Sequence, residues 1–460
     1  MLIIRNVEVA NLAGLDVRIQ AGRVTEIGQG LSGGETVDGR GGALIPGLVD
    51  HHIHLLALAA QASSVDLQAV VSPDDLAVRL HAAAAVGSGW IRAVGYHERL
   101  GGALHRGILD RLVPQRPLRV QHQSGSLWVF NSRALERLGV EGGGPTELEL
   151  DATGRPTGRL WRGDPWLRAR LDDDPPELAP IGRQLAACGV TGVTDASAST
   201  DATGAALLAG AHRAGLLPQR LTLMSHGPLL APDDGAFSVG PLKILIDDHD
   251  LPDLEVMISA IARARAEARS VAVHCVTAAE LALTLAAFEA AGARTGDRIE
   301  HGGVIPAEAI ASVAALGLTV VTQPGFVHER GDRYLSDVAA ADQDDLYRCA
   351  SLLAAGIPVA GSSDAPYASP DPWAGIGAAI RRRSRAGRQI GPAEAVDPRR
   401  ALALYQSDPQ TPGGAARRVA RGAVADLCLL AAPLASVLAE PLAGQVRLTL
   451  IDGEVAYYAG

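Results

Sequence analysis

A repeated alternation of short apolar runs and helical stretches dominates this sequence from about residue 185 onward. Helical patterns such as Leu254–Ala268 and Ala278–Ala290 separate seven runs of strand character, and an eighth strand, Leu44–His54, comes earlier. The seven runs are Gly189–Asp195, Arg220–Ser225, Leu242–Asp247, Val271–Val276, Arg298–His301, Leu318–Gln323 and Ile357–Ser362. Strands that alternate with helices predict a parallel sheet with helical crossovers.

The spacing of these units distinguishes two parallel-sheet architectures. Lys243, His274 and His301 lie in three successive strands, at intervals of 31 and 27 residues. Eight units in a barrel of about 250 residues need roughly 30 residues each. A doubly wound open sheet is the weaker alternative, because no glycine-rich dinucleotide-binding turn follows the first strand. The sequence therefore predicts an α/β fold, a (β/α)8 TIM barrel.

Two additions to the barrel are expected from the rest of the chain. Both ends contain short strands separated by turns, so residues 1–45 and 405–460 are predicted to form one small β-sandwich domain. The barrel then spans residues 46–404, with residues 60–180 inserted after its first strand. Such an insertion is placed to cap a site at the barrel mouth, whereas shielding of the barrel or an oligomer contact is an equal alternative.

Composition excludes several classes of function. The formal net charge of −10 argues against nucleic acid as a partner. No run of about 18 apolar residues is present, and the N-terminus lacks a signal-peptide pattern, so we expect no membrane partner. Four scattered cysteines without a CxxC pair suit free thiols in a reducing compartment. We therefore expect a cytoplasmic protein that acts on a small-molecule substrate and forms a homodimer.

Lysine is the most unusual residue type in the chain. Lys243 is the single lysine among 41 basic residues, and it lies in the apolar run Pro241–Asp247, where a solvated cation is not expected. Burial lowers the pKa of a lysine and produces a usable amine, which a guanidinium does not provide. A chemical role for Lys243 is therefore favoured over an accidental one.

Polar residues recur where the predicted barrel strands end. In the first strand, period-two alternation places Asp50, His52 and His54 on one face and His51 on the other. Asp50 is expected to orient a ligand histidine, and His51 is not expected to be a ligand. Because the carboxyl ends of barrel strands meet at one mouth, six residues are predicted to converge there: His52, His54, Lys243, His274, His301 and Asp364.

These residue types suit a metal-dependent hydrolase. Neutral imidazole binds zinc and similar divalent ions, and two ions about 3.5–4 Å apart polarise a carbonyl and make hydroxide from water. Close cations need an anionic bridge, and a desolvated lysine amine can take up carbon dioxide to become a carbamate. Asp364 could bind one ion and pass a proton to the leaving amine as the catalytic acid and base. We predict one or two divalent ions, most simply zinc, with Lys243 as the residue that could be carboxylated.

Motifs along nearly the whole chain resemble the amidohydrolase superfamily. They include "LIPGLVDHHIHL", "PLKILIDD", "VAVHC", "RIEHGGVIP" and "AAGIPVAGSSDAP". The resemblance is to the branch, amidohydrolase family 3, that includes N-substituted formamide deformylase and D-aminoacylase-like proteins. It implies a metal-dependent hydrolase with a (β/α)8 barrel and a small β-sandwich. By resemblance, one metal would be bound by His52, His54 and Asp364 and the second by His274 and His301, with Lys243 as the bridge.

The sequence departs from that branch at two places where substrate should lie. Ser124-Gly125-Ser126 replaces the usual Asp-Gly-His of the insertion, and the segment 244–249 differs after the strand-four lysine. Both departures leave the hydrolytic residues in place and leave the substrate open.

Three functions are compatible with these residues. The first is hydrolysis of an amide-type C–N bond by a metal-bound hydroxide, in an N-acyl, N-formyl or cyclic amide of a small molecule. The second is a single-metal deaminase, but its usual proton-shuttling Glu close after His274 is missing, and the first Glu is Glu280. The third is a non-catalytic scaffold, which should lack ligands, and none is missing.

Other charged residues are assigned structural roles. His97, His122, His249 and His328 could contact substrate, but surface or packing positions are favoured for each. The run 381–383, three consecutive arginines, is predicted to be solvated.

Overall fold

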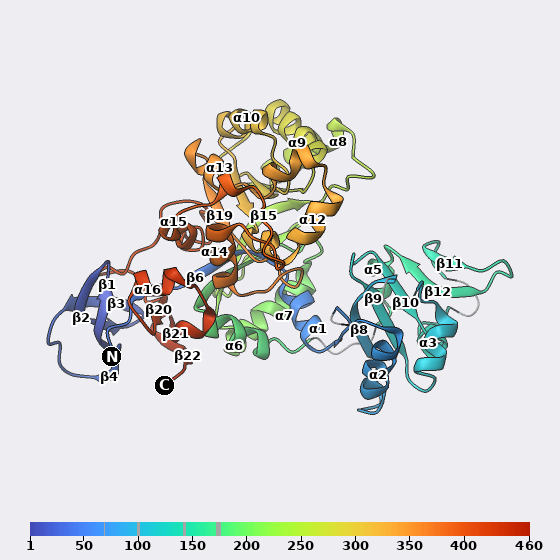
Figure 1. Cartoon of the computed structure of the whole chain (residues 1–460), viewed down its shortest axis with the longest axis horizontal. Helices are drawn as coiled ribbons and strands as arrows, with labels where there is room; N and C mark the ends of the chain where they lie inside the picture. The colour runs from blue at the N-terminus through green and yellow to red at the C-terminus, as the bar shows by residue number, and fades with distance from the viewer. Residues whose placement is uncertain (69, 99–101, 141–143, 172–175) are drawn as a thin grey trace. The chain divides into compact units, whose positions relative to one another are not determined.

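The computed structural model describes residues 1–68, 70–98, 102–140, 144–171 and 176–460, and every gap lies inside the insertion predicted for residues 60–180. The chain divides into two compact units. One consists of Met1–Leu55 with Leu178–Gly460, and the other is Leu56–Glu177. Figure 1 labels the elements of both.

An eight-stranded parallel sheet is the centre of the first unit. In sheet order its strands are β6 (Leu48–Ile53), β13 (Val190–Asp195), β14 (Arg220–Ser225), β15 (Ser238–Ile244), β16 (Val271–Cys275), β17 (Arg298–His301), β18 (Thr319–Thr322) and β19 (Val359–Gly361). Hydrogen bonds then join the two edges of the sheet. Asp364 N donates to His52 O, and His54 N donates to Ala365 O, each over 2.8 Å. The sheet thus closes into the predicted TIM barrel, and the fold prediction is confirmed.

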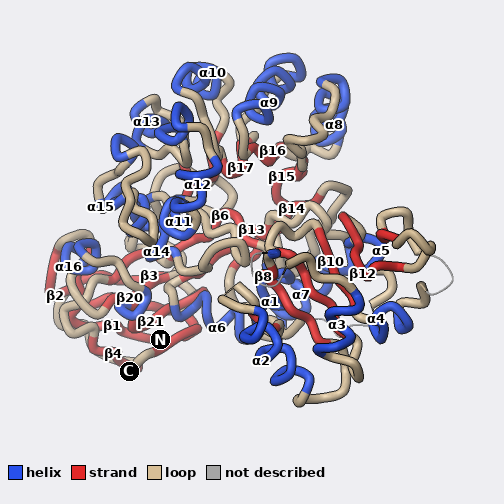
Figure 2. The backbone as a smooth tube through the Cα atoms, turned by 45° about the vertical axis from the view of Figure 1, so that its right-hand side comes forward, coloured by secondary structure: helices blue, strands red, loops and turns tan. Residues whose placement is uncertain are grey.

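Helices connect and cover the barrel strands, and Figure 2 shows α8, α9 and α10 outside β15, β16 and β17. The helices of this unit are α6 (Ala179–Ala187), α7 (Ala202–Arg213), α8 (Leu254–Ala266), α9 (Ala278–Ala291), α10 (Ile310–Ala315), α11 (Pro324–Glu329), α12 (Gly331–Asp337), α13 (Ala350–Ala354), α14 (Pro372–Arg381), α15 (Pro398–Ala403) and α16 (Leu434–Ala439). The start of α9 shows why these positions are helical. Thr277 and Glu280 form a capping box that satisfies free amides of its first turn.

The predicted strand Leu44–His54 is in fact two strands in different sheets. The first part, β5 (Leu44–Pro46), pairs antiparallel with β20 (Leu427–Leu430), and only the second part, β6, enters the barrel. Gly47 lies at the break, where a Cβ atom would come within 2.1 Å of the Thr191 side chain. A glycine therefore allows the close backbone approach through which the chain passes from one sheet to the other.

Two small four-stranded sheets are built from the ends of the chain. One has the order β3 (Arg23–Gly28), β2 (Leu12–Gln20), β1 (Leu2–Val9) and β4 (Glu35–Asp38), and the other has the order β22 (Glu454–Tyr458), β21 (Val446–Ile451), β20 and β5. Ile4 and Val17 of the first sheet share one buried apolar cluster with Leu429 and Leu448 of the second. The two chain ends lie close together beside these sheets (Figure 1).

The second unit, Leu56–Glu177, contains a six-stranded mixed sheet. In sheet order its strands are β11 (Leu148–Leu150), β12 (Pro156–Trp161), β10 (Leu127–Phe130), β9 (Leu118–His122), β8 (Ile91–Tyr96) and β7 (Val65–Asp66). Its helices are α1 (Leu55–Ala62, which starts at the boundary), α2 (Pro73–Ala84), α3 (Arg106–Leu112), α4 (Ser132–Arg137) and α5 (Asp164–Arg168). Leu80, Leu109 and Val129 belong to one buried apolar cluster, so this unit has its own core.

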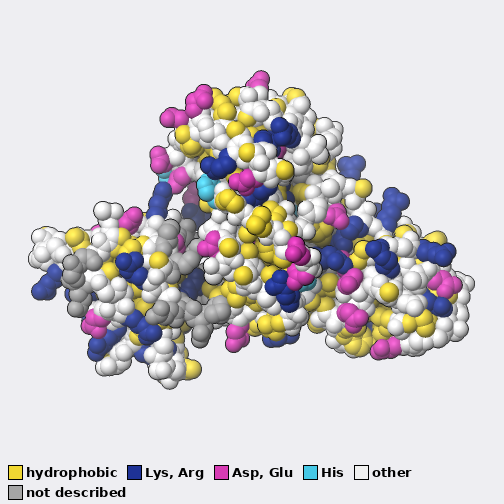
Figure 3. Space-filling model, turned by 180° about the vertical axis from the view of Figure 1, so that it is seen from behind, with side chains coloured by type: hydrophobic (Ala, Val, Ile, Leu, Met, Phe, Trp, Pro, Cys, Tyr) yellow, Lys and Arg dark blue, Asp and Glu magenta, His cyan; other side chains and the backbone are white. Residues whose placement is uncertain are grey.

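Two features of the helices and of the surface bear on the sequence predictions. Within the ranges that the structure describes, no helix is long and apolar enough to cross a membrane. Figure 3 shows positive and negative side chains interspersed over one face of the molecule.

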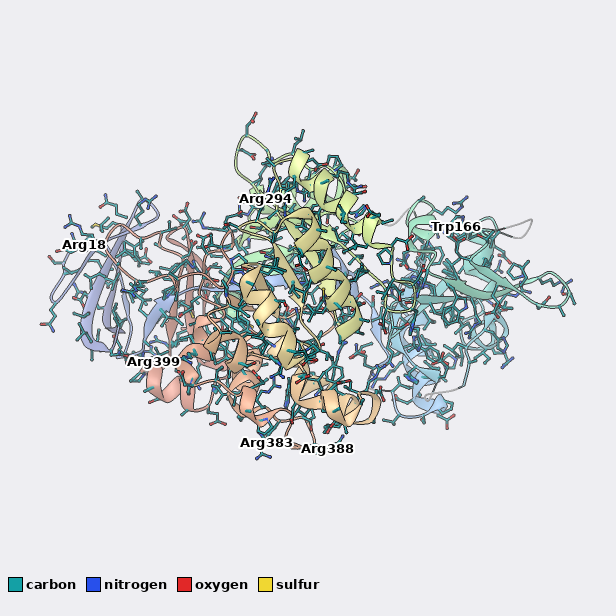
Figure 4. The ribbon with its side chains drawn as sticks, turned by 90° about the horizontal axis from the view of Figure 1, so that it is seen from above. Arg18, Trp166, Arg294, Arg383, Arg388 and Arg399 are labelled. Atoms are coloured by element: carbon teal, nitrogen blue, oxygen red, sulfur yellow. The ribbon has the colours of Figure 1, made fainter. Side chains whose placement is uncertain are left out.

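The arginine run 381–383 is not solvated throughout, which corrects the prediction. Arg382 is fully buried and left-handed at the end of α14. Its guanidinium donates hydrogen bonds to the carbonyls of Leu346, Tyr347 and Ile390. Arg383 is exposed and points outward (Figure 4). The several donors of one guanidinium satisfy carbonyls that lie beyond the reach of solvent, which explains a buried arginine at this helix end.

Candidate active site

All six predicted site residues lie at or just after the carboxyl ends of barrel strands. His52 lies in β6 and His54 follows it, whereas Lys243, His274 and His301 lie in β15, β16 and β17, and Asp364 follows β19. The four imidazoles form a continuous group. The ring centroids are 5.3 Å apart for His52 and His54, 4.7 Å for His52 and His301, and 4.5 Å for His274 and His301.

Three of these side chains form a candidate metal-binding triad. The Asp364 Oδ1 atom lies 3.1 Å from His54 Nε2 and 3.4 Å from His52 Nε2. One ligand atom from each of the three residues lies within 4.8 Å of the other two. Two imidazole nitrogens and a carboxylate oxygen are a donor set suited to zinc and similar ions.

Outer hydrogen bonds orient three of the four histidines through their Nδ1 atoms. The Glu300 carboxylate accepts a hydrogen bond from His52 Nδ1, and Gln323 Oε1 accepts one from His301 Nδ1 over 3.0 Å. His54 Nδ1 lies 2.9 Å from the Ser197 hydroxyl oxygen. An acceptor at Nδ1, as His52 and His301 have, fixes the tautomer in which Nε2 is unprotonated, and this is the arrangement that metal-binding histidines usually have.

Burial sets the ionisation of the site. It lowers the pKa of His274 to about 4 and the pKa values of His52 and His301 well below the ordinary value. Burial opposes ionisation of Asp364, but the hydrogen bond from His54 and the neighbouring imidazoles hold its pKa well below its usual range. At neutral pH these three imidazoles are therefore neutral and Asp364 is a carboxylate, which are the protonation states that bind metal ions.

Lys243 is buried beside this group. Its side chain is among the largest fully buried side chains, and its Nζ atom has no hydrogen-bond partner among the residues that the structure describes. Burial lowers the pKa of Lys243, and nearby Glu300 opposes that shift. A buried amine without a partner is costly to keep, so Nζ fits a site whose remaining partner comes from outside the chain.

The two faces of β6 divide as the alternation predicted. Asp50 accepts hydrogen bonds from the backbone amide and hydroxyl of Ser363, so it holds the segment before Asp364 instead of bonding a histidine ring. His51 points the other way, and its Nε2 lies 3.0 Å from the Ser407 hydroxyl. His51 is thus part of the packing outside the ligand group.

His301 reaches the site through an unusual backbone conformation. In β17, Glu300 pairs with His274 and His301 pairs with Cys275, whose sulfur lies 3.2 Å from the Thr284 hydroxyl in α9. Regular alternation would therefore direct His301 toward the helices. Its φ of 69° breaks the alternation, and Asp364 also has a positive φ, 55°. Strained non-glycine residues cluster at functional sites, which supports a functional role for this strand end.

The sequence prediction missed Glu300 and Arg298. Both are buried in β17, where Arg298 Nε donates to the Glu300 carboxylate and Arg298 Nη2 donates to His51 O over 2.9 Å. Arg298 thus holds the Glu300 carboxylate, which in turn fixes the His52 ring through Nδ1. Two charged residues at alternate positions of a short predicted barrel strand were the available signal, because such charges are buried only when they are paired.

Other candidate residues take structural roles. Glu280 accepts hydrogen bonds from the amides of the α9 capping box. Asp195 accepts hydrogen bonds from Leu55 N at the start of α1 and from Ser197 N. His328 Nδ1 bonds the Arg383 carbonyl on the surface.

Replacing Glu300 by glutamine should weaken metal binding by about 10–100-fold, because His52 loses the carboxylate that orients its ring. Competition with a chromophoric chelator measures this change. Glu280→Gln is the matched control, since Glu280 is also a buried acid but caps a helix. Equal zinc affinity in the two variants would contradict a positioning role for Glu300.

Comparison with known proteins gives consistent relationships along the whole chain. A model of an amidohydrolase family matches residues 35–457. N-substituted formamide deformylase of Arthrobacter pascens is 24% identical, over 99% of this chain and 97% of that protein. Putative amidohydrolase YtcJ of Bacillus subtilis (strain 168) is 26% identical, over 92% of this chain and 90% of that protein.

The fold comparison points the same way. The crystal structure of an uncharacterized metal-dependent hydrolase from Pyrococcus furiosus is similar to this chain with a TM-score of 0.72 at 21% identity, and the similarity covers 93% of this chain and 98% of that one.

Proposed function

Because this chain belongs to the amidohydrolase family, and is therefore a hydrolase of carbon–nitrogen bonds other than peptide bonds, we propose that it hydrolyses a small N-formyl, N-acyl or cyclic amide. The observation that carries this proposal is the group formed by His52, His54 and Asp364. His301 and Lys243 are buried beside it, and Lys243 Nζ has no hydrogen-bond partner in the described parts of the chain. A substrate amide at this barrel end would meet ionised Asp364 and neutral imidazoles together.

The residues present fit divalent metal ions. His52, His54 and Asp364 would hold one ion, and His274 and His301 a second, with Lys243 between the two sets. Zinc is proposed because the donors are imidazole nitrogens and one carboxylate. When bound, such ions polarise a carbonyl oxygen and lower the pKa of water.

Asp364 is proposed as the group that moves the proton. Its carboxylate is buried, and its low pKa keeps it ionised at neutral pH. It can accept a proton from the attacking water and pass it to the leaving nitrogen, which must be protonated before the C–N bond breaks. Hydrogen bonds from Ser363 to Asp50 hold the backbone immediately before Asp364, so the carboxylate is fixed in place during the transfer.

Lys243 is proposed to react with carbon dioxide. The Nζ lone pair forms a bond to the carbon while one C=O π bond opens, and one N–H proton is released to solvent. The product is a carbamate whose single negative charge is shared by two oxygens. Burial lowers the pKa of this amine and so favours the neutral nitrogen that this reaction needs. A second anion would also balance the charge of two divalent ions among neutral imidazoles.

No observation favours the deaminase alternative. A deaminase would need a free acid just after His274 to move protons, and Glu280 is instead engaged by the backbone at the start of α9. A non-catalytic scaffold also lacks support, because all six predicted residues are present at the strand ends.

The first test is a substrate panel. N-formyl amines come first, because the formamide deformylase relative aligns over nearly its whole length, followed by N-acyl amino acids and cyclic amides. We expect acid and free amine as products from at least one class, and loss of bound zinc together with turnover in His52→Asn. His51→Asn is the control, since His51 faces away from the group.

Ammonia release from an amino-substituted ring, without turnover of any amide, would overturn the proposal in favour of a deaminase. Full activity of metal-free protein or of His52→Asn would overturn the metal-dependent hydrolase itself.

A further inference from the structure

The insertion unit contains a second group of metal-type side chains, made of His97, Glu98 and His122. We propose that these three residues form a separate divalent-metal site in Leu56–Glu177, with zinc as the expected ion. The site belongs wholly to that unit and shares no residue with the barrel group. It does not depend on the proposed function.

The sheet brings these residues together. Strands β8 and β9 are parallel neighbours, and Tyr96 at the end of β8 is in register with His122 at the end of β9. His97 and Glu98 directly follow β8, so the three side chains stand at the same edge of the sheet. This is the arrangement by which parallel strands assemble sites at their carboxyl ends.

The donor atoms converge on one point. Glu98 Oε2 lies 3.1 Å from His122 Nε2 and 3.7 Å from His97 Nδ1. One ligand atom from each residue lies within 4.8 Å of the others, and the two imidazole centroids are 5.6 Å apart. Two nitrogens and one carboxylate oxygen repeat the donor set of the barrel triad.

The Ser124 hydroxyl contacts Nδ1 of His122, the ring nitrogen that does not face Glu98. This Nδ1 lies 2.8 Å from Ser124 Oγ and accepts a hydrogen bond from the Ser124 backbone amide over 3.1 Å. These contacts hold the ring by Nδ1 and leave Nε2 facing Glu98. The pKa of Glu98 is lowered, since its own backbone amide and the two histidines favour the carboxylate although partial burial opposes it. A bridging cation would satisfy both imidazoles and the carboxylate at once.

Access and ligand number suit an ion that enters from solvent. The side chains are 26% exposed for His97, 41% for Glu98 and 15% for His122. Three protein ligands leave a fourth tetrahedral position that water can fill. The bound ion would tie the chain after β8 to the turn after β9, and so it would stabilise this unit by an amount that rises with the logarithm of free zinc.

The test counts zinc in the full-length protein. Wild type and His97→Ala/His122→Ala are equilibrated at the same free zinc concentration, and bound zinc is measured by elemental analysis. We expect one zinc equivalent fewer per chain in the double variant, because the barrel ions are common to both proteins. His81→Ala is the matched control, since it removes an exposed imidazole of the same unit and should bind as much zinc as wild type.

Two single variants test the same site with smaller changes, in case the double variant does not fold. Glu98→Gln removes a ligand oxygen, and Ser124→Ala removes only the outer hydroxyl and should lower zinc affinity at this site about tenfold. Circular dichroism of metal-free protein confirms that each variant is folded. The reciprocal variant His52→Asn/Asp364→Asn should hold one zinc equivalent more than the same variant with His97→Ala/His122→Ala added, whatever the occupancy of His274 and His301.

Equal zinc content in folded wild type and His97→Ala/His122→Ala would overturn the proposal, as would equal zinc loss in His81→Ala. A reciprocal variant without bound zinc would also overturn it. None of these results would bear on hydrolysis in the barrel, so the two proposals fail separately.

Discussion

Asp364→Asn is expected to lower kcat by about 10²–10⁴-fold, the contribution usual for a positioned general acid or base. Asparagine keeps the shape of the side chain but cannot accept the proton of the attacking water. It also removes the one carboxylate that faces both His52 and His54. Steady-state kinetics on the best substrate of the panel, with zinc content measured in parallel, tests this expectation.

The control for Asp364→Asn is Asp371→Asn. Asp371 caps α14, and asparagine is an equally good cap, so both fold and turnover should be retained. A kcat close to wild type in Asp364→Asn with zinc still bound would remove Asp364 from the proton-transfer role.

Lys243→Arg is expected to abolish the second metal equivalent and most turnover. Arginine keeps the positive charge but cannot form a carbamate. Its bulkier head group also has to fit where the Lys243 side chain is fully buried. Metal analysis and kinetics measure both losses, and Lys243→Met separates the loss of the amine from the change in size, because it keeps an unbranched apolar stem.

The carbamate itself can be observed. Wild type reconstituted with zinc in carbon-13-labelled bicarbonate should show a carbamate resonance that is missing from Lys243→Arg. The chain has one lysine, so the N-terminal amine is the main other source of such a signal, and it is common to both proteins. Two bound zinc ions and full activity without this resonance would exclude carboxylation of Lys243.

Much of the barrel could be predicted because each strand is locally encoded. The predicted bounds Arg298–His301 and Arg220–Ser225 coincide with β17 and β14, and Gly189–Asp195 differs from β13 by one residue. Apolar and β-branched runs between helical patterns carry that information without tertiary context. The division of Leu44–His54 was missed, because its cause is the close contact of Gly47 with Thr191, more than a hundred positions away in the chain.

The side chains of the candidate site were likewise predictable only where the signal was local in the sequence. His52 and His54 stood out from their spacing, and Lys243 from its uniqueness. Glu300 as the partner of His52 could not be predicted, since 248 positions separate them and regular alternation cannot say which strands become neighbours. His97 and His122 were assigned to surface or packing positions for the same reason, and Glu98 was not identified.

The sequence alone determined the class of fold and the kinds of side chain that could do chemistry, because strand propensity, helix periodicity and residue type are local properties. Only the tertiary structure decided how those side chains are oriented. Closure of the sheet brings His52 of its first strand and Asp364 after its last strand together, and the positive φ of His301 turns its ring toward His274. Both effects depend on packing between distant segments, which no local pattern specifies.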